Sequence, residues 1–161
     1  GRRTQIEVHM NFIDIRIKET SEVGWRFTGD YGEPSGDKKH LAWDYVRQLH
    51  AMICLPWLTA GDFNDFTSAQ EREATRPQRS MHVFSSALGD CNLDDLGYNG
   101  ELFTWRRGRI RENLDRVVGN SALADQFPWL SNHQFDKSDQ RPIVMDIGLQ
   151  SRVQPRGPCG P

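Results

Sequence analysis

A short apolar run, residues 55–60, most constrains what this chain can fold into, because a glycine and two polar side chains follow it directly. The run is bounded by Pro56 and Gly61 and is too short for a periodic helix, so it predicts a buried strand. Asp62 and Asn64 are two residues apart, a spacing that directs both side chains to one side of an extended chain. Together they can hold a water and a phosphoryl oxygen. The same spacing also fits an Asx-type turn whose side chains bond only local backbone.

The composition indicates one globular domain. The 161 residues include 20 Lys and Arg against 22 Asp and Glu, so the net charge of −2 gives no overall basic field for nucleic acid, and such contact would need a local patch. Mean hydropathy is −0.68, but five Trp and eight Phe argue against disorder. The sequence has no long apolar span or signal peptide, which predicts an intracellular protein, nuclear or cytoplasmic, without membrane contact. Its pattern specifies no oligomeric state.

Cysteine usage supports the same compartment. The cysteines at positions 54, 91 and 159 are odd in number and lack metal-ligand spacing. They are therefore predicted to be free thiols in a reducing environment.

Alternating strand and helix patterns predict an α/β fold. Strands are expected within residues 6–17 (two short strands or one bulged strand), 25–31, 55–60, 102–105, 114–118 and 142–149. Helices are expected at residues 38–53, 81–88 and 121–127. Residues 1–150 would form the domain, and the Pro/Gly/Arg-rich residues 151–161 a linker or tail.

The helix predictions carry details that a structure can check. In residues 38–53 the stripe predicted to be apolar is Leu41, Tyr45, Leu49 and Met52. Either Ser35 or Asp37 is expected to cap this helix, and Ser121 is expected to cap the last one.

Six motifs follow one another in a fixed order. They are WRFTGDYGEP at residues 25–34, LPWLTAGDFN at 55–64, RPQR at 76–79, FTW at 103–105, LDR at 114–116 and SDQRPI at 138–143. This order resembles the endonuclease/exonuclease/phosphatase superfamily and, within it, the endonuclease domain of plant LINE-type (non-LTR) retrotransposons. The resemblance runs from about residue 25 to residue 147.

The resemblance implies a four-layered α/β sandwich, in which two packed β-sheets are flanked by helices. It also implies Mg²⁺-dependent (or Mn²⁺-dependent) hydrolysis of phosphodiesters. In the retroelement branch the substrate is DNA, which is nicked to prime reverse transcription. A reverse transcriptase domain is therefore expected downstream in a full-length element.

Catalytic roles also follow from the resemblance. Asp62 would orient or deprotonate the attacking water, and Asn64 would hold that water and the scissile phosphate. Tyr31 would donate its hydroxyl to the phosphate as charge builds. Asp139 matches the acid of the family's closing Ser-Asp-His motif, near phosphate and metal, and is the candidate metal ligand. Asp115 matches the carboxylate that orients the histidine of that motif.

A nucleic-acid contact is implied beside these residues. Thr104 and Trp105 would lie along the DNA backbone, and a dense basic cluster would add phosphate contacts. The cluster consists of Arg106, Arg107, Arg109 and Arg111. Simpler interpretations remain open: Tyr31 and Trp105 as core aromatics, and the basic cluster as a solvated loop.

Several positions depart from the family pattern. Gln140 stands where the closing motif has histidine, and glutamine cannot carry a proton or a positive charge. Asp30 stands where an aromatic residue is common, and Asn113 where arginine is usual. Ahead of Tyr31 the sequence lacks the family's opening segment with its metal-ligating Glu, so the opening strands of the sandwich are expected to be missing.

The sequence thus predicts a truncated, degenerate Mg²⁺-dependent DNA endonuclease-like domain of retrotransposon origin, weakly active or inactive, with weak DNA binding. A non-catalytic nucleic-acid-binding relic is the main alternative, favoured by Gln140 and the absent Glu segment. A phosphatase of the same superfamily is the other, and the motifs at residues 25–34 and 103–105 argue against it.

Overall fold

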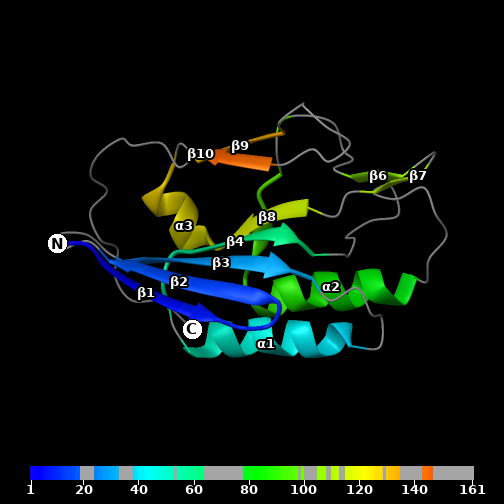
Figure 1. Ribbon diagram of the computed structural model, residues 1–161, viewed down its shortest axis with the longest axis horizontal. Helices are drawn as coiled ribbons and strands as arrows, with labels where there is room; N and C mark the ends of the chain where they lie inside the picture. Colours follow the sequence, from blue (N-terminus) through cyan, green and yellow to red (C-terminus); the bar gives the residue numbers. More distant parts are fainter. Residues whose placement is uncertain are drawn as a thin grey trace.

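The computed structural model describes residues 1–18, 24–32, 38–52, 54–63, 78–97, 99, 105–107, 110–112, 115–128, 130–134 and 143–146. Three helices are interspersed among the strands of this part of the chain (Figure 1). The strands are β1 (Arg3–Val8), β2 (Phe12–Lys18), β3 (Trp25–Tyr31), β4 (Trp57–Asp62), β5 (Asp94–Asp95), β6 (Trp105–Arg107), β7 (Ile110–Glu112), β8 (Asp115–Gly119), β9 (Ser131–Gln134) and β10 (Ile143–Asp146). The helices are α1 (Lys39–Met52), α2 (Gln78–Asp90) and α3 (Ser121–Gln126).

A six-stranded sheet in the order β1-β2-β3-β4-β8-β5 is the centre of the fold. The first three strands are joined as antiparallel neighbours, whereas β3 and β4 run parallel and are connected through α1. β8 then pairs antiparallel with β4. Because β3 and β4 run parallel, their carboxyl ends lie at the same edge of the sheet. Two smaller sheets, β9–β10 and β6–β7, complete the described strands.

Each face of the large sheet has its own apolar core. Helices α1 and α2 cover one face, where Trp43 of α1 stacks on Phe63 and on Phe84 of α2. On the other face Leu58 and Val117 pack with α3 and with residues next to and within the β9–β10 sheet. The predicted α/β class, with two packed sheets and flanking helices, is confirmed.

Strand β3 alternates as predicted, but its polar side is the more deeply buried one. Arg26, Thr28 and Asp30 are 0%, 1% and 6% exposed, while Trp25 and Phe27 on the other side are only half-buried. Burying a charged side chain requires a partner, and Asp14 on β2 supplies one for Arg26.

Helix α1 forms where it was predicted, but with a different buried face. Leu41 and Met52 are 58% and 64% exposed, and of the predicted stripe only Leu49 is fully buried. The buried face instead centres on Trp43, because this large side chain fills the space against the aromatic residues of the neighbouring elements. The predicted caps of this helix at positions 35 and 37 lie outside the described residues.

Other boundaries differ from the predictions in smaller ways. Residues 6–17 form two strands, which selects the first of the two expected alternatives. The central strand is shifted by two residues, so that Gly61 and Asp62 belong to β4. The N-cap of α3 is Asn120, whose Oδ1 accepts a hydrogen bond from the Leu123 amide at 3.0 Å, and Ser121 is the first helical residue. The sequence analysis predicts no strand at β9.

The cysteine prediction is right for Cys91, a buried free thiol, and wrong for Cys54, which is disulfide-bonded. A disulfide requires two Cβ atoms within about 4 Å, a proximity that spacing along the chain does not reveal. None of the described helices is long and apolar enough to cross a membrane.

Candidate functional site

Three of the predicted site residues lie side by side at one edge of the large sheet. Tyr31 at the end of β3 pairs with Asp62 at the end of β4, and Asp62 pairs with Asp115 at the start of β8. Side chains at paired positions of neighbouring strands lie about 5 Å apart. Alternation along each strand places all three on the face that carries the core of Leu58 and Val117. We call them the Tyr31–Asp62–Asp115 row.

The row is accessible. Tyr31 is 64% exposed, and Asp62 and Asp115 are half-buried. A phenol hydroxyl and two carboxylates can therefore meet a ligand from solvent.

Glycines allow the ends of β3 and β4 to approach each other closely. Gly61 has φ of +149°, and a Cβ atom there would collide with the carbonyl oxygen of Asp30. A Cβ atom on Gly32 would collide with the backbone of Phe63. The Gly32 amide donates a hydrogen bond to the carbonyl oxygen of Asp62 at 2.5 Å. These contacts fix the backbone that carries Asp62 next to that of Tyr31.

A further acid lies directly behind the row, on the helix-covered face of the sheet. Asp30 is 6% exposed, and neither of its carboxylate oxygens accepts a hydrogen bond within the part of the chain that the structure describes. Burial, and secondly the nearby negative charge of Asp62, raise the pKa of Asp30 from 3.8 to about 8. Asp30 therefore holds a proton at neutral pH. The sequence marks this position only as a departure from an aromatic residue, and its burial was not predicted.

The described residues include two carboxylates whose chemistry suits a divalent cation. No group of three or more His, Cys, Asp or Glu in the described ranges is arranged to hold a metal. The row nevertheless offers two carboxylates on adjacent strands, and Mg²⁺ is commonly held by one or two carboxylates together with waters and substrate phosphates. The donor chemistry of Asp62 and Asp115 thus fits such a cation.

Several predicted residues cannot be placed with the row. Those outside the described residues are Asn64, Thr104, Arg109, Asp139 and Gln140.

The rest of the predicted nucleic-acid contact lies on the β6–β7 hairpin. Arg106 and Arg111 occupy paired positions on the two strands, and Trp105 pairs with Glu112. Arg107 pairs with Ile110. Three of the four arginines of the basic cluster therefore lie on paired strands, and Arg109 lies outside the described residues.

A family comparison decides what this fold is. The model of the Endonuclease/Exonuclease/phosphatase family matches residues 3–139. The chain belongs to this family. Because the match begins at residue 3, this endonuclease/exonuclease/phosphatase domain includes β1 and β2, whereas the resemblance in the sequence is placed from about residue 25. No curated protein sequence matches the chain.

Solved structures share the fold of this endonuclease/exonuclease/phosphatase domain at low identity. The endonuclease domain of TRAS1, a telomere-specific non-LTR retrotransposon, superposes with a TM-score of 0.70 at 16% identity, over 92% of this chain and 70% of that one. The 3′-5′ exonuclease NExo from Neisseria meningitidis gives 0.60 at 15%, over 90% and 70%. A β-hairpin deletion mutant of Staphylococcus aureus beta toxin gives 0.54 at 15%, over 91% and 55%. At these identities the likeness shows the fold alone.

Proposed function

We propose that this chain is a phosphodiesterase-type domain that acts on DNA, derived from the endonuclease of a plant LINE-type (non-LTR) retrotransposon, with a strongly reduced rate in this copy. The observation that carries the proposal is the Tyr31–Asp62–Asp115 row, which brings a hydroxyl donor and two carboxylates together from three strands. Membership of the family and the likeness to the TRAS1 endonuclease domain support it.

In this proposal each residue of the row has a separate task. Asp62 accepts a proton from the attacking water or orients it, since an ionised carboxylate can only accept hydrogen bonds. Tyr31 donates its hydroxyl to a phosphate oxygen, where negative charge grows in the transition state. Asp115, beside Asp62, orients the group at position 140. Asn64, two residues after Asp62, holds the water and the scissile phosphate.

A divalent cation is the expected cofactor, as it is for the family. When bound, Mg²⁺ or Mn²⁺ would neutralise charge on the phosphate. Asp139 is its proposed ligand, and the carboxylates of Asp62 and Asp115 have the chemistry to share it.

Gln140 is the reason for the reduced rate. The family's histidine carries a proton or a positive charge at this position, and glutamine can do neither. Loss of a group that transfers a proton typically costs about 10²–10⁴ in rate. Residues 1–30 carry no match to the family's Glu-bearing motif, and this would cost more, although losses within one site do not add.

The β6–β7 hairpin is the proposed DNA contact, extended by Thr104 and Arg109. Arg106 and Arg111 stand at paired positions of the two strands, and arginines are common partners of backbone phosphates. The resulting binding would be weak, independent of sequence and reduced by salt. In a full-length element a reverse transcriptase domain would act on the nicked product.

Nicking of supercoiled plasmid with Mg²⁺ tests the proposal. Four proteins are compared: the chain itself, Gln140→His, Gln140→His carrying the opening segment of the TRAS1 endonuclease domain at its N-terminus, and that third protein with Asp62→Ala. The first two are expected to give little or no nicking. The third is expected to nick in Mg²⁺ and not in a chelator, and Asp62→Ala is expected to abolish this activity.

Two other outcomes would change the conclusion. Strong Mg²⁺-dependent nicking by the unmodified chain, lost on Asp62→Ala, would disprove the reduced rate. A third protein that is folded, as judged by circular dichroism, but inactive would favour the non-catalytic nucleic-acid-binding relic.

A further inference from the structure

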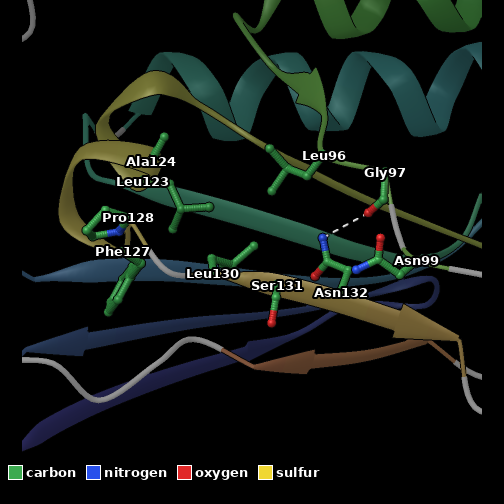
Figure 2. A pocket seen from close by; sticks show the side chains of 10 residues that line it. All are labelled: Leu96, Gly97, Asn99, Leu123, Ala124, Phe127, Pro128, Leu130, Ser131 and Asn132. Atoms are coloured by element: carbon green, nitrogen blue, oxygen red, sulfur yellow. Dashed lines mark hydrogen bonds between the residues drawn. The ribbon is translucent and has the colours of Figure 1, made fainter.

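A pocket of about 540 Å³ lies beside α3, between the six-stranded sheet and the β9–β10 sheet. Its walls carry polar and apolar surface in similar shares and come from the turn after β5, from α3 and from the segment leading into β9 (Figure 2). The main apolar residues are Leu96, Leu123, Ala124, Phe127, Pro128 and Leu130. This volume is in the range of pockets that hold small organic ligands.

The pocket is separate from the Tyr31–Asp62–Asp115 row. Strand β8 begins at Asp115 and ends at Gly119, next to α3, so about 13 Å of strand lies between the row and the start of that helix. The Leu96 wall lies nearer the row, since the Leu96 amide donates to the Val117 carbonyl oxygen, and a ligand packed against α3 would not occupy the proposed phosphodiester site.

One buried polar atom in the pocket points to a ligand. Asn132 is 5% exposed, and its Nδ2 donates a hydrogen bond to the carbonyl oxygen of Gly97 at 2.9 Å. Its main-chain carbonyl accepts one from the Asn99 amide, also at 2.9 Å. Its Oδ1 accepts none within the described part of the chain, and Figure 2 shows this oxygen on the Leu130 side of the side chain.

The Nδ2 bond to Gly97 fixes the orientation of the Asn132 carboxamide, and the main-chain bond holds the strand that carries it, so its Oδ1 is a positioned acceptor. A buried acceptor without a donor is costly, and a ligand that donates to it recovers that cost.

We propose that this pocket binds a neutral heteroaromatic group with a single N–H donor, of which indole is the simplest example. The flat apolar body would lie against Leu123, Leu130 and Phe127, and the N–H would donate to Asn132 Oδ1. Phe127 is held in place by an edge-to-face contact with Trp25, whose ring centroid is 5.4 Å away. The group could come from a free metabolite or from a tryptophan side chain of a partner.

A nucleobase fits these walls less well, although DNA is the proposed substrate. Purines and pyrimidines carry several acceptors around their rings, and among the lining side chains only those of Ser131 and the two asparagines contain donor groups. Each acceptor left without a donor would weaken binding.

Titration of the full chain with five probes tests the proposal. Binding is monitored through the NMR chemical shifts of the backbone amides of Leu96, Leu123 and Leu130. Indole is expected to bind with Kd on the order of 0.1–1 mM, as is usual for a ligand of this size. Benzofuran, which replaces N–H by oxygen, and 1-methylindole are expected to bind about 3–10-fold more weakly, because the hydrogen bond to Asn132 is lost. Adenine is expected to bind more weakly than indole. Binding of N-acetyltryptophanamide as tight as that of indole would identify a tryptophan side chain as the source, and weaker binding a free metabolite.

A matched pair of variants locates the site. Ala124 is an exposed residue at the pocket, so Ala124→Phe should block it and weaken indole binding at least about tenfold. Ser121→Phe adds the same ring to the same helix at an exposed position outside the pocket and should leave binding unchanged. Three results would overturn the proposal: no shifts at millimolar indole, equal binding of indole and benzofuran, or tighter binding of adenine than of indole.

Discussion

Strand β3 buries one ionisable side chain near each of its ends. The two are similarly buried, but they differ in their hydrogen-bond partners. Arg26 forms a two-bond contact with Asp14, through Nε to Oδ1 at 2.7 Å and Nη2 to Oδ2 at 2.9 Å. Its Nη1 donates to the Leu49 carbonyl oxygen at 2.7 Å, and its guanidinium lies 5.0 Å from the ring centroid of Trp57. Asp30, on the same face, accepts no hydrogen bond from any described group.

The comparison shows where this fold is built for stability and where it is not. At the Arg26 end two charges satisfy each other and join β2, β3 and α1. At the Asp30 end a carboxyl is buried without a hydrogen-bond partner among the described groups, burial raises its pKa, and it lies next to the row proposed to act on phosphate. Unfavourable local environments of this kind are concentrated at functional sites.

The largest expected effect is the pH dependence that Asp30 imposes on stability. Its folded pKa of about 8 lies above the ordinary 3.8, so its stabilising contribution is complete below pH 3.8 and is lost as pH rises toward 8. The loss amounts to roughly 6 kcal/mol. Asp30→Asn cannot ionise and should remove this part of the pH dependence.

Urea unfolding across this pH range measures the effect. Asp44→Asn, on the exposed surface of α1, is the control and should leave the slope unchanged. Parallel curves for the wild type and Asp30→Asn would contradict the assignment of a proton to Asp30.

At the other end of β3, Arg26→Met should destabilise the fold by about 3–5 kcal/mol, because the buried Asp14 would lose its two-bond partner and keep the longer ion pair to Arg16 at 3.8 Å. Unfolding in urea at one fixed pH gives the value. Arg47→Met removes an exposed arginine that bonds Asp90 at 2.9 Å and should cost at most about 1 kcal/mol. Similar losses for the two variants would mean that the buried pair is not special.

Gly61→Ala tests the close approach of the β4 backbone to the β3 backbone at Asp30. Its φ of +149° and the collision with the Asp30 carbonyl predict a loss of about 1–3 kcal/mol or more. Gly89→Ala in α2 meets no atom within 4 Å and should instead stabilise by about 0.5–1 kcal/mol. Thermal unfolding of both variants shows whether each substitution lowers or raises stability. A stabilised Gly61→Ala would show that β4 tolerates a side chain there.

The smallest effect joins the Asp30 end to the row. The charge of Asp62 helps to raise the pKa of Asp30, so Asp62→Asn should move the stability transition to lower pH. Asp115→Asn is the control, since Asp115 is not among the causes of that shift. NMR titration of the Asp30 carboxyl carbon measures the shift directly. If the titration midpoint of Asp30 is unchanged in Asp62→Asn, the charge of Asp62 does not influence the Asp30 carboxyl.

Periodicity predicted most of the elements but not the depth of burial. Alternation located β3 to the residue, and the change of phase after Met10 correctly allowed two strands. The buried face of α1 was wrong because Trp43 contacts Phe63 and Phe84, which come from other parts of the chain. A four-residue strand such as β9 carries too little pattern to predict.

For the site, motif order identified Tyr31, Asp62 and Asp115, and their register shows how three strands bring them together. The catalytic roles stay predictions. No local pattern predicted Asp30, because a polar residue at an alternating position normally indicates a solvent-facing side. Here α1 and α2 cover that side.

The pairing of β4 with β8 has a consequence for synthesis on the ribosome. β1, β2 and β3 pair with near neighbours, but Asp62 must wait for Asp115, about 53 residues later. At about 5–20 residues per second, one edge of β4 stays open for roughly 3–10 s after the strand has been made. During that interval the nascent chain offers unpaired backbone groups to any other extended segment. A chaperone that covers this edge of β4 would prevent such pairing.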